Sequence, residues 1–182
     1  MESDQMTANF KIVLVGDEAV GKTSLVRRLI DENFLQDYLP TLGFEISCKN
    51  IEIEGINITF TIWDIGGQQI FEPIRRSYYT ESRGFLLVFN LANRVTFRNV
   101  DYWVSEVRET CPGAPIILVG AKADLDEWHV TAEDVEQKAN ELQLDDQIIT
   151  SAKTNEGVVD AFTLLAQAIL KNREVNAESI SE

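Results

Sequence analysis

The chain has few of the residues that mark several protein classes. Its 182 residues include only 2 cysteines, 4 prolines and 1 histidine. Cys48 and Cys111 lack the close spacing of metal ligands, so we expect reduced thiols in a cytoplasmic protein. No apolar run approaches the roughly 18 residues that a membrane span needs. The start, Met1-Glu2-Ser3-Asp4, does not resemble a signal peptide, so we expect neither insertion into a membrane nor secretion.

Positive charge is also scarce. The chain carries 16 basic residues against 30 acidic ones, which gives a net charge of −14. Such a surface repels phosphate backbones and anionic lipids, so we expect no binding to nucleic acid. Position 2 lacks the glycine of a myristoylation motif, and residues 177–182 contain no cysteine that could be prenylated. We therefore expect a monomer without a lipid anchor, which reaches membranes only through its partners.

The residues that are present indicate one globular domain. Hydrophobic residues make up 45% of the chain and charged residues 25%, as is ordinary for a globular protein. Apolar runs and helical periodicity predict alternating elements. The predicted strands cover 10–15, 44–54, 57–63, 85–90, 115–120 and 146–150, and the predicted helices cover 21–33, 94–109, 131–142 and 156–172. Residues 32–42 lack a periodic pattern, and we expect a long surface loop there.

The order of these elements predicts the fold class. A short turn at 54–57 makes its two strands antiparallel, whereas strands separated by helices pair in parallel. We therefore predict an α/β fold of three layers, with a six-stranded, mostly parallel sheet, one antiparallel edge strand and helices on both faces. We expect a loose N-terminus over 1–8, a domain over 9–173 and an acidic tail over 174–182.

One loop stands out chemically. Gly16-Asp17-Glu18-Ala19-Val20-Gly21-Lys22-Thr23 follows an apolar strand and leads into a helix. In this context the pattern predicts a phosphate-binding loop, whereas an isolated glycine-rich turn would not. Its glycines let backbone N–H groups point at phosphates, and the helix N-terminus adds partial positive charge. Lys22 supplies a full charge, and the Thr23 hydroxyl suits Mg²⁺. We expect a nucleoside phosphate to bind here.

Five separated motifs make the chain similar to the small GTPases of the Ras superfamily, over about residues 10–172. They are Gly16–Thr23, Pro40-Thr41, Asp64-Ile65-Gly66-Gly67-Gln68, Ala121-Lys122-Ala123-Asp124 and Ser151-Ala152-Lys153. The resemblance implies the P-loop NTPase fold known as the small G domain. The phosphate loop and first switch resemble Rab and Rho proteins, whereas the double glycine of the second switch is similar to Arf proteins. No subfamily follows from these signatures.

The resemblance implies a role for each matched residue. Thr23, Thr41 and Asp64 would hold Mg²⁺, Asp64 through water because Mg²⁺ dehydrates reluctantly. Gly67 would bring its N–H close to the γ-phosphate, and Gln68 would orient the attacking water. When the γ-phosphate leaves, Thr41 and Gly67 would lose their partner and both loops would relax.

Guanine selection would depend on Asp124, because a carboxylate can accept hydrogen bonds from both donors on that base. Lys122 would lie along the base, and the Ala152 N–H would meet the guanine oxygen. Phe34 fits the aromatic residue that packs against the base, although an ordinary core phenylalanine fits nearly as well. The remaining nucleotide-binding positions are Glu18, Ala19, Val20, Gly21, Lys22, Thr23, Ser24, Tyr38, Ser151 and Lys153.

Two residues depart from the family pattern. Ala121 stands where the family has asparagine or threonine, and the lost hydrogen bond predicts faster nucleotide exchange. Glu18 stands where the family often has glycine or serine. Its carboxylate would either crowd Gln68 and repel the γ-phosphate, or point to solvent; both interpretations remain open.

We therefore expect a GTP/GDP switch that hydrolyses GTP slowly and meets effectors, an exchange factor and a GTPase-activating protein through residues 36–45 and 66–79. The alternatives are a nucleotide-locked or pseudo-GTPase scaffold and an ATP-using P-loop kinase. Asp124 and Ser151-Ala152-Lys153 argue against the kinase. The phosphate loop contains no arginine, and we expect Arg75 and Arg76 to be solvated. Tyr78 and Tyr79 would flank the partner surface or pack in the core, and His129 would lie on the surface.

Overall fold

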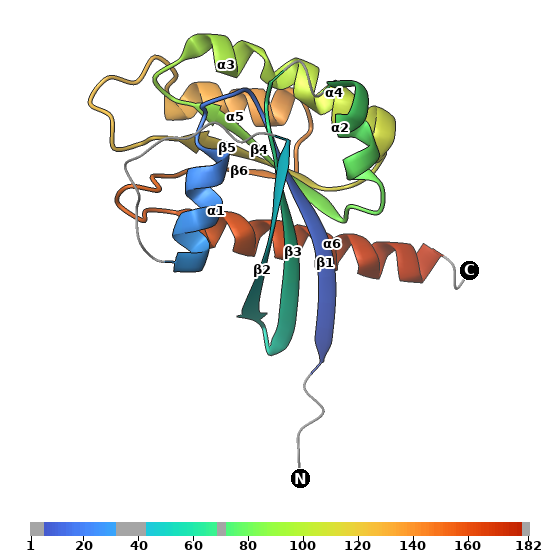
Figure 1. Cartoon of the computed structure of the whole chain (residues 1–182). Coiled ribbons are helices and arrows are strands. Elements are labelled where there is room, and N and C mark those ends of the chain that lie inside the picture. The colour runs from blue at the N-terminus through green and yellow to red at the C-terminus, as the bar shows by residue number, and fades with distance from the viewer. Residues whose placement is uncertain (1–5, 32–42, 69–71, 180–182) are drawn as a thin grey trace.

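The computed structural model describes residues 6–31, 43–68 and 72–179, with the backbone alone over 174–179. Its centre is a six-stranded sheet in the order β2-β3-β1-β4-β5-β6 (Figure 1). The strands are β1 Thr7–Val15, β2 Phe44–Ile53, β3 Ile56–Ile65, β4 Gly84–Asn90, β5 Ile116–Ala121 and β6 Asp146–Ile149. The edge strand β2 pairs antiparallel with β3, and all other neighbours are parallel. The predicted sheet, including its antiparallel edge, is confirmed.

Helices cover both faces of the sheet (Figure 1). They are α1 Lys22–Asp31, α2 Glu72–Tyr79, α3 Arg94–Arg98, α4 Val100–Thr110, α5 Ala132–Glu141 and α6 Val158–Ser179. Side chains of α1 and α6 pack in the core on one face, and side chains of α2, α3, α4 and α5 pack in the core on the other. The three predicted layers are therefore present.

Strand alternation explains why two cores form. In β1, Ile12 and Leu14 belong to the core beneath α1 and α6, whereas Val13 and Val15 belong to the opposite core. Successive side chains of a strand point to opposite faces, and all four of these are at most 1% exposed. A strand that is apolar at every position is typical of a parallel sheet with helices on both sides.

The single helix that we predicted over 94–109 is wrong in one respect. The structure has two helices, α3 and α4, that meet at Asn99. Backbone hydrogen bonds from the Asn99 N–H to Val95 O and from the Trp103 N–H to Asn99 O continue across the break. Asparagine favours such a junction because its short polar side chain bonds outside the helix; here it donates to Asp17.

The predicted termini also need correction. We expected a loose N-terminus over 1–8, but β1 begins at Thr7, which pairs with Asn57 of β3. We predicted that the last helix ends at 172, but α6 continues through Ser179 because Glu174–Ser179 contains no proline or glycine to stop it; the acidic tail over 174–182 stays a prediction. The predicted start of α5 is confirmed: the Thr131 hydroxyl accepts from Asp134 N–H, and the Asp134 carboxylate accepts from Thr131 N–H.

The loop predicted over 32–42 lies outside the described residues. In the part of the chain that the structure describes, no helix combines the length and apolar character that crossing a membrane requires.

Candidate nucleotide-binding site

The site lies where β1 and β3 end at the same edge of the sheet. Leu14 of β1 is in register with Asp64 of β3, so the loop after Val15 faces the carboxyl end of β3. Gly16 begins this loop with a φ of 137°. A Cβ at that position would lie 2.1 Å from the Val88 carbonyl oxygen, so only glycine fits. Ligands of open α/β sheets bind at this edge.

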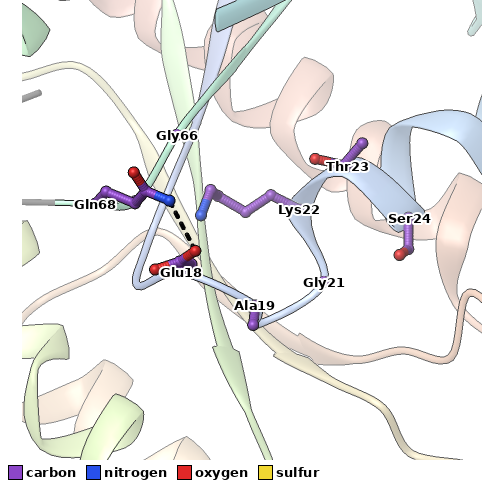
Figure 2. A pocket seen from close by; sticks show the side chains of 9 residues that line it. Glu18, Ala19, Gly21, Lys22, Thr23, Ser24, Gly66 and Gln68 are labelled. Carbon is purple, nitrogen blue, oxygen red and sulfur yellow. Dashed lines mark hydrogen bonds between the residues drawn. The ribbon is translucent and has the colours of Figure 1, made fainter. Parts of the chain in front are cut away.

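Lys22 lies at the centre of the loop and is 6% exposed. Its Nζ donates to the Gly16 carbonyl at 2.8 Å and to the Asp17 carbonyl at 2.7 Å. Burial lowers the pKa of Lys22 to about 8, although the nearby carboxylates of Asp64 and Asp17 oppose the shift. In a chain of net charge −14, this ammonium group is a local cation that points across the loop (Figure 2).

Thr23 and Asp64 form the predicted metal-binding pair. The Thr23 hydroxyl donates to Asp64 Oδ2, whereas the other carboxylate oxygen, Oδ1, is buried without a hydrogen-bond partner. Burial raises the pKa of Asp64, and the Thr23 hydrogen bond and the Lys22 charge oppose this. A buried carboxylate oxygen beside a hydroxyl suits Mg²⁺, which binds proteins through one or two carboxylates plus phosphates and water. The residues present therefore fit the ion.

Gly67 packs directly on the phosphate loop. A Cβ at this position would lie 2.3 Å from the Gly16 carbonyl oxygen and 2.6 Å from the Glu18 nitrogen. Any side chain would push the segment after β3 away from the loop. The absence of a side chain therefore lets Gly67 lie against the phosphate loop, whereas the expected approach of its N–H to the γ-phosphate stays a prediction.

Glu18 contacts the predicted catalytic glutamine. Gln68 Nε2 donates to Glu18 Oε1 at 2.8 Å, and Figure 2 shows the two side chains pointing toward each other across the mouth of the pocket. Of the two interpretations that we left open, the contact with Gln68 is the one that the structure contains. The walls of this pocket are Glu18, Ala19, Gly21, Lys22, Thr23, Ser24, Gly66, Gly67 and Gln68.

The motifs predicted to bind the base meet the phosphate loop from the other side. Lys122 follows β5 with a φ of 66°, and its Nζ donates to the Ala19 carbonyl at 2.8 Å. Burial lowers the pKa of Lys122, and the Asp124 carboxylate opposes the shift. Asp124 accepts from the Ser151 hydroxyl at 2.7 Å, and Lys153 Nζ lies 3.9 Å from its other oxygen. These contacts orient the Asp124 carboxylate.

The backbone beside Ala121 belongs to Thr150, whose buried hydroxyl lacks a hydrogen-bond partner. The Thr150 N–H donates to Gly120 O, and the Thr150 carbonyl accepts from the Ala123 N–H. Thr150 is therefore paired with the backbone on both sides of Ala121. Thr150 is fully buried, and its hydroxyl has no hydrogen-bond partner. The Ala121 Cβ would lie 3.6 Å from a Cβ built on Gly21, which places its methyl group against the phosphate loop. An apolar methyl therefore occupies a polar junction.

Some predicted residues take other positions. Val20 is 1% exposed and its side chain packs in the core, so only its backbone can reach a ligand. Phe34, Tyr38 and Thr41 lie outside the described residues, so their roles stay predictions. The prediction of a solvated Arg75 is wrong, because Arg75 is 2% exposed and forms an ion pair with Glu106.

Sequence reasoning also missed a residue that supports the base motif. Arg28 of α1 donates from Nε to the Ala152 carbonyl at 2.6 Å and from a terminal nitrogen to the Lys153 carbonyl at 2.8 Å. These bonds attach the loop that bears Ala152 to the helix that follows the phosphate loop. No local pattern could reveal them, since the partners lie far apart in the sequence.

The surface residues give mixed outcomes. Arg76 is exposed, as predicted, and its ion pair with Glu109 is also exposed. Tyr79 is fully buried, so the core interpretation is confirmed for it, whereas Tyr78 is partly exposed and packs against Phe44 and Trp63. A place for Tyr78 at a partner surface stays a prediction. His129 is exposed, as predicted.

Comparison with known proteins agrees with this geometry. The model of the Ras family matches residues 11–171. The Ras-related protein Rab-15 of Homo sapiens is 34% identical over 94% of this chain and 81% of its own length. The probable Ras-related protein Rab-4A of Echinococcus multilocularis is 36% identical over 99% of this chain and 83% of its own length. The Ras-related protein Rab-13 of Rattus norvegicus is 35% identical over 88% of this chain and 80% of its own length. The chain therefore belongs to the Ras superfamily of small GTPases, as a Rab-like enzyme that hydrolyses GTP.

Proposed function

We propose that this GTPase is a Mg²⁺-dependent switch that holds GTP or GDP in the loop around Lys22, hydrolyses GTP slowly and reports the bound nucleotide to partner proteins. The observation that carries the proposal is the meeting of three groups at one edge of the sheet. They are the buried Lys22 ammonium, the Thr23–Asp64 pair and the backbone of Gly67 packed on the phosphate loop. Each is suited to a different part of a magnesium-bound triphosphate.

Thr23 and Asp64 would hold the Mg²⁺, together with Thr41. When bound, the ion neutralises charge on the β- and γ-phosphate oxygens. Within the described residues, no cluster of three or more His, Cys, Asp or Glu side chains could hold a metal alone.

Hydrolysis requires Gln68 to orient the attacking water. Its amide nitrogen is hydrogen-bonded to Glu18, and the phosphate loop contains no arginine to stabilise the transition state. Ras proteins turn over at about 10⁻⁴ s⁻¹ unaided and roughly 10⁵-fold faster when a partner supplies an arginine. We infer slow intrinsic turnover here, with stimulation by a GTPase-activating protein.

Partner proteins would read residues 36–45 and 66–79. Among the described residues of these segments, Phe44 is 42% exposed and Ile74 is 49% exposed. The Phe44 ring stacks on Trp63 at 5.2 Å and lies 4.8 Å from Tyr78. Aromatic side chains such as Phe44 and Tyr78 are enriched at protein interfaces. The chain would act as a cytoplasmic monomer that partners recruit to membranes.

The test begins with the nucleotide that co-purifies. Denaturing the purified protein should release GDP or GTP, which chromatography then identifies. In a competition assay, unlabelled GTP should displace a fluorescent GDP analogue at least about 10⁴ times more effectively than ATP does. Single-turnover hydrolysis should then be slow and dependent on Mg²⁺. Equal displacement by ATP, or an unaided rate near about 1 s⁻¹, would contradict the proposal.

A further inference from the structure

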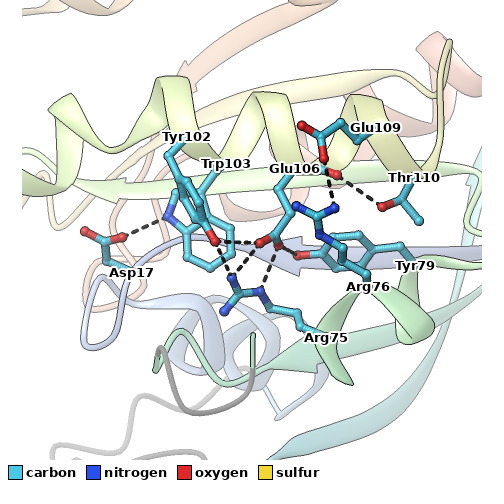
Figure 3. Close-up of polar contacts among 9 residues, drawn as sticks. All are labelled: Asp17, Arg75, Arg76, Tyr79, Tyr102, Trp103, Glu106, Glu109 and Thr110. Carbon is cyan, nitrogen blue, oxygen red and sulfur yellow. Dashed lines mark hydrogen bonds and ion pairs between the residues drawn. The ribbon is translucent and has the colours of Figure 1, made fainter. Parts of the chain in front are cut away.

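A buried polar network joins α2 to α4, on the side of the sheet away from α1. Arg75 of α2 donates to both oxygens of Glu106, from Nε at 2.8 Å and from a terminal nitrogen at 2.7 Å. The hydroxyls of Tyr79 and Tyr102 donate to the same carboxylate at 2.6 and 2.7 Å. Figure 3 shows these three side chains converging on Glu106.

The protonation states in this network follow from its contacts. Burial opposes the charges on Arg75 and Glu106, but the hydrogen bonds between them outweigh it. The pKa of Arg75 is therefore raised and the pKa of Glu106 is lowered. Burial and the hydrogen bond to Glu106 raise the pKa of Tyr102 to about 12. The bidentate ion pair is thus permanent at neutral pH, and it fixes α2 against α4.

Trp103 continues the network toward the nucleotide. The Arg75 guanidinium lies 4.3 Å from the centre of the Trp103 ring, in cation–π geometry. The indole N–H at the edge of the same ring, Nε1, donates to Asp17 Oδ1 at 2.8 Å (Figure 3). Trp103 is 3% exposed, so its ring and the stacked Arg75 are shielded from water, whereas Asp17 is only partly buried.

Asp17 is the point at which this network reaches the phosphate loop. Its carboxylate accepts from Trp103 and, at 2.7 Å, from the Asn99 side chain. Its backbone carbonyl accepts from Lys22 Nζ at 2.7 Å. Asp17 is therefore held at its carboxylate by Trp103 of α4 and at its backbone carbonyl by Lys22, the lysine that would bind phosphate.

We propose that Trp103 and Asp17 are positioning residues, which transmit the location of α2 to the phosphate loop and so set how long the nucleotide stays bound. This inference rests on the proposed nucleotide binding. Its consequence is regulatory: a protein that displaces α2, which lies within the proposed partner surface, loosens the loop around Lys22 through Arg75 and Trp103 without touching the nucleotide.

The experiment is a double-mutant cycle on the rate of GDP dissociation, measured by chasing a fluorescent GDP analogue from the Mg²⁺-loaded full chain. Trp103→Phe keeps the buried ring but removes its donor to Asp17, and it should accelerate release about three- to tenfold. Arg75→Lys keeps the charge but loses the two-pronged bond and the planar stacking, and it should accelerate release about two- to fivefold. The double variant should fall short of the product of the two effects by at least about twofold.

Glu109→Ala is the matched control. Glu109 also joins α4 to α2, through Arg76, but both side chains of that pair are exposed and the structure shows no bond from it to the phosphate loop. It should leave the dissociation rate within about 1.5-fold of the wild type and act independently of Trp103→Phe. Denaturant unfolding of every nucleotide-loaded variant separates a change in loop position from a general loss of stability.

The outcomes are distinguishable. A wild-type chain that fails to bind GDP overturns the proposed function. Binding by the wild type with no faster release from Trp103→Phe, or with strictly multiplicative effects, overturns the positioning role alone. If Trp103→Phe does not fold, Asn99→Ala removes the other donor to Asp17 and should accelerate release in the same direction; an unchanged rate there also overturns the role.

Discussion

Replacing Ala121 with asparagine should slow the release of GDP. Ala121 is 5% exposed, its methyl group lies against Gly21 of the phosphate loop, and the adjacent Thr150 hydroxyl is buried without a partner. An asparagine amide has two donors and an acceptor, so it can satisfy that hydroxyl and reach either the loop or the base.

The magnitude follows from the groups involved. A buried polar group left without a partner costs about 1–3 kcal/mol. Each 1.4 kcal/mol corresponds to about tenfold in an equilibrium constant, so restored bonds could change GDP affinity by about five- to 150-fold. We expect about tenfold slower release, near the lower end, because the larger side chain must fit a closely packed site.

The assay is the release of a fluorescent GDP analogue after addition of excess unlabelled GDP. Ala121→Leu is the matched control, since leucine has the same number and branching of side-chain heavy atoms as asparagine but no amide. If leucine slows release as much as asparagine does, filling space rather than hydrogen bonding is responsible. An Ala121→Asn rate equal to that of the wild type would refute the reasoning, because the missing bonds would then be supplied elsewhere.

Three further predictions test the site and its support. Glu18→Gly should free Gln68 and raise single-turnover GTP hydrolysis up to about tenfold in the presence of an activating partner, whereas an unchanged rate would mean that their hydrogen bond does not restrain the glutamine. Arg75→Ala should lower the free energy of unfolding by about 3–5 kcal/mol in a denaturant titration, because it strands the buried Glu106 carboxylate, and adding Glu106→Leu should restore only part of the loss, because the buried Tyr79 hydroxyl then lacks its acceptor. Burial lowers the pKa of Lys22 to about 8, and only its charged form attracts phosphate, so GDP affinity should fall by up to about tenfold per pH unit above about pH 8; affinity that stays constant to about pH 9.5 would contradict this.

Glu106 adds a pH dependence of stability with a defined sign. Its pKa is lowered in the folded chain, so the stability it contributes is complete above the ordinary glutamate pKa of 4.5. That stability is lost as the pH falls through the lowered value. Glu106→Gln should therefore flatten the acid limb of a plot of unfolding free energy against pH, and an unaltered limb would show that other carboxylates dominate it.

The fold and the chemistry of the phosphate loop could be predicted because both depend on patterns of residues that are contiguous in the sequence. Continuous apolar runs such as 85–89 can only be buried on both faces, which implies a sheet between two layers of helices. The spacing of glycines, Lys22 and Thr23 in the phosphate loop is enough to predict phosphate binding, because the donors of the loop are backbone groups of neighbouring residues. A capping box such as that at Thr131 is equally local.

Only the tertiary structure decided which side chains meet. Arg75 resembles a solvated surface arginine in sequence, yet it is buried because Glu106, Tyr79 and Tyr102 converge on it from positions along two helices. The contact between Trp103 and Asp17 spans 86 residues. Such pairs form only when elements that are distant in the sequence pack together. The local periodicity of either element therefore does not predict them. Local backbone preference therefore determined the elements and the loop, whereas packing between distant segments determined how the loop is held.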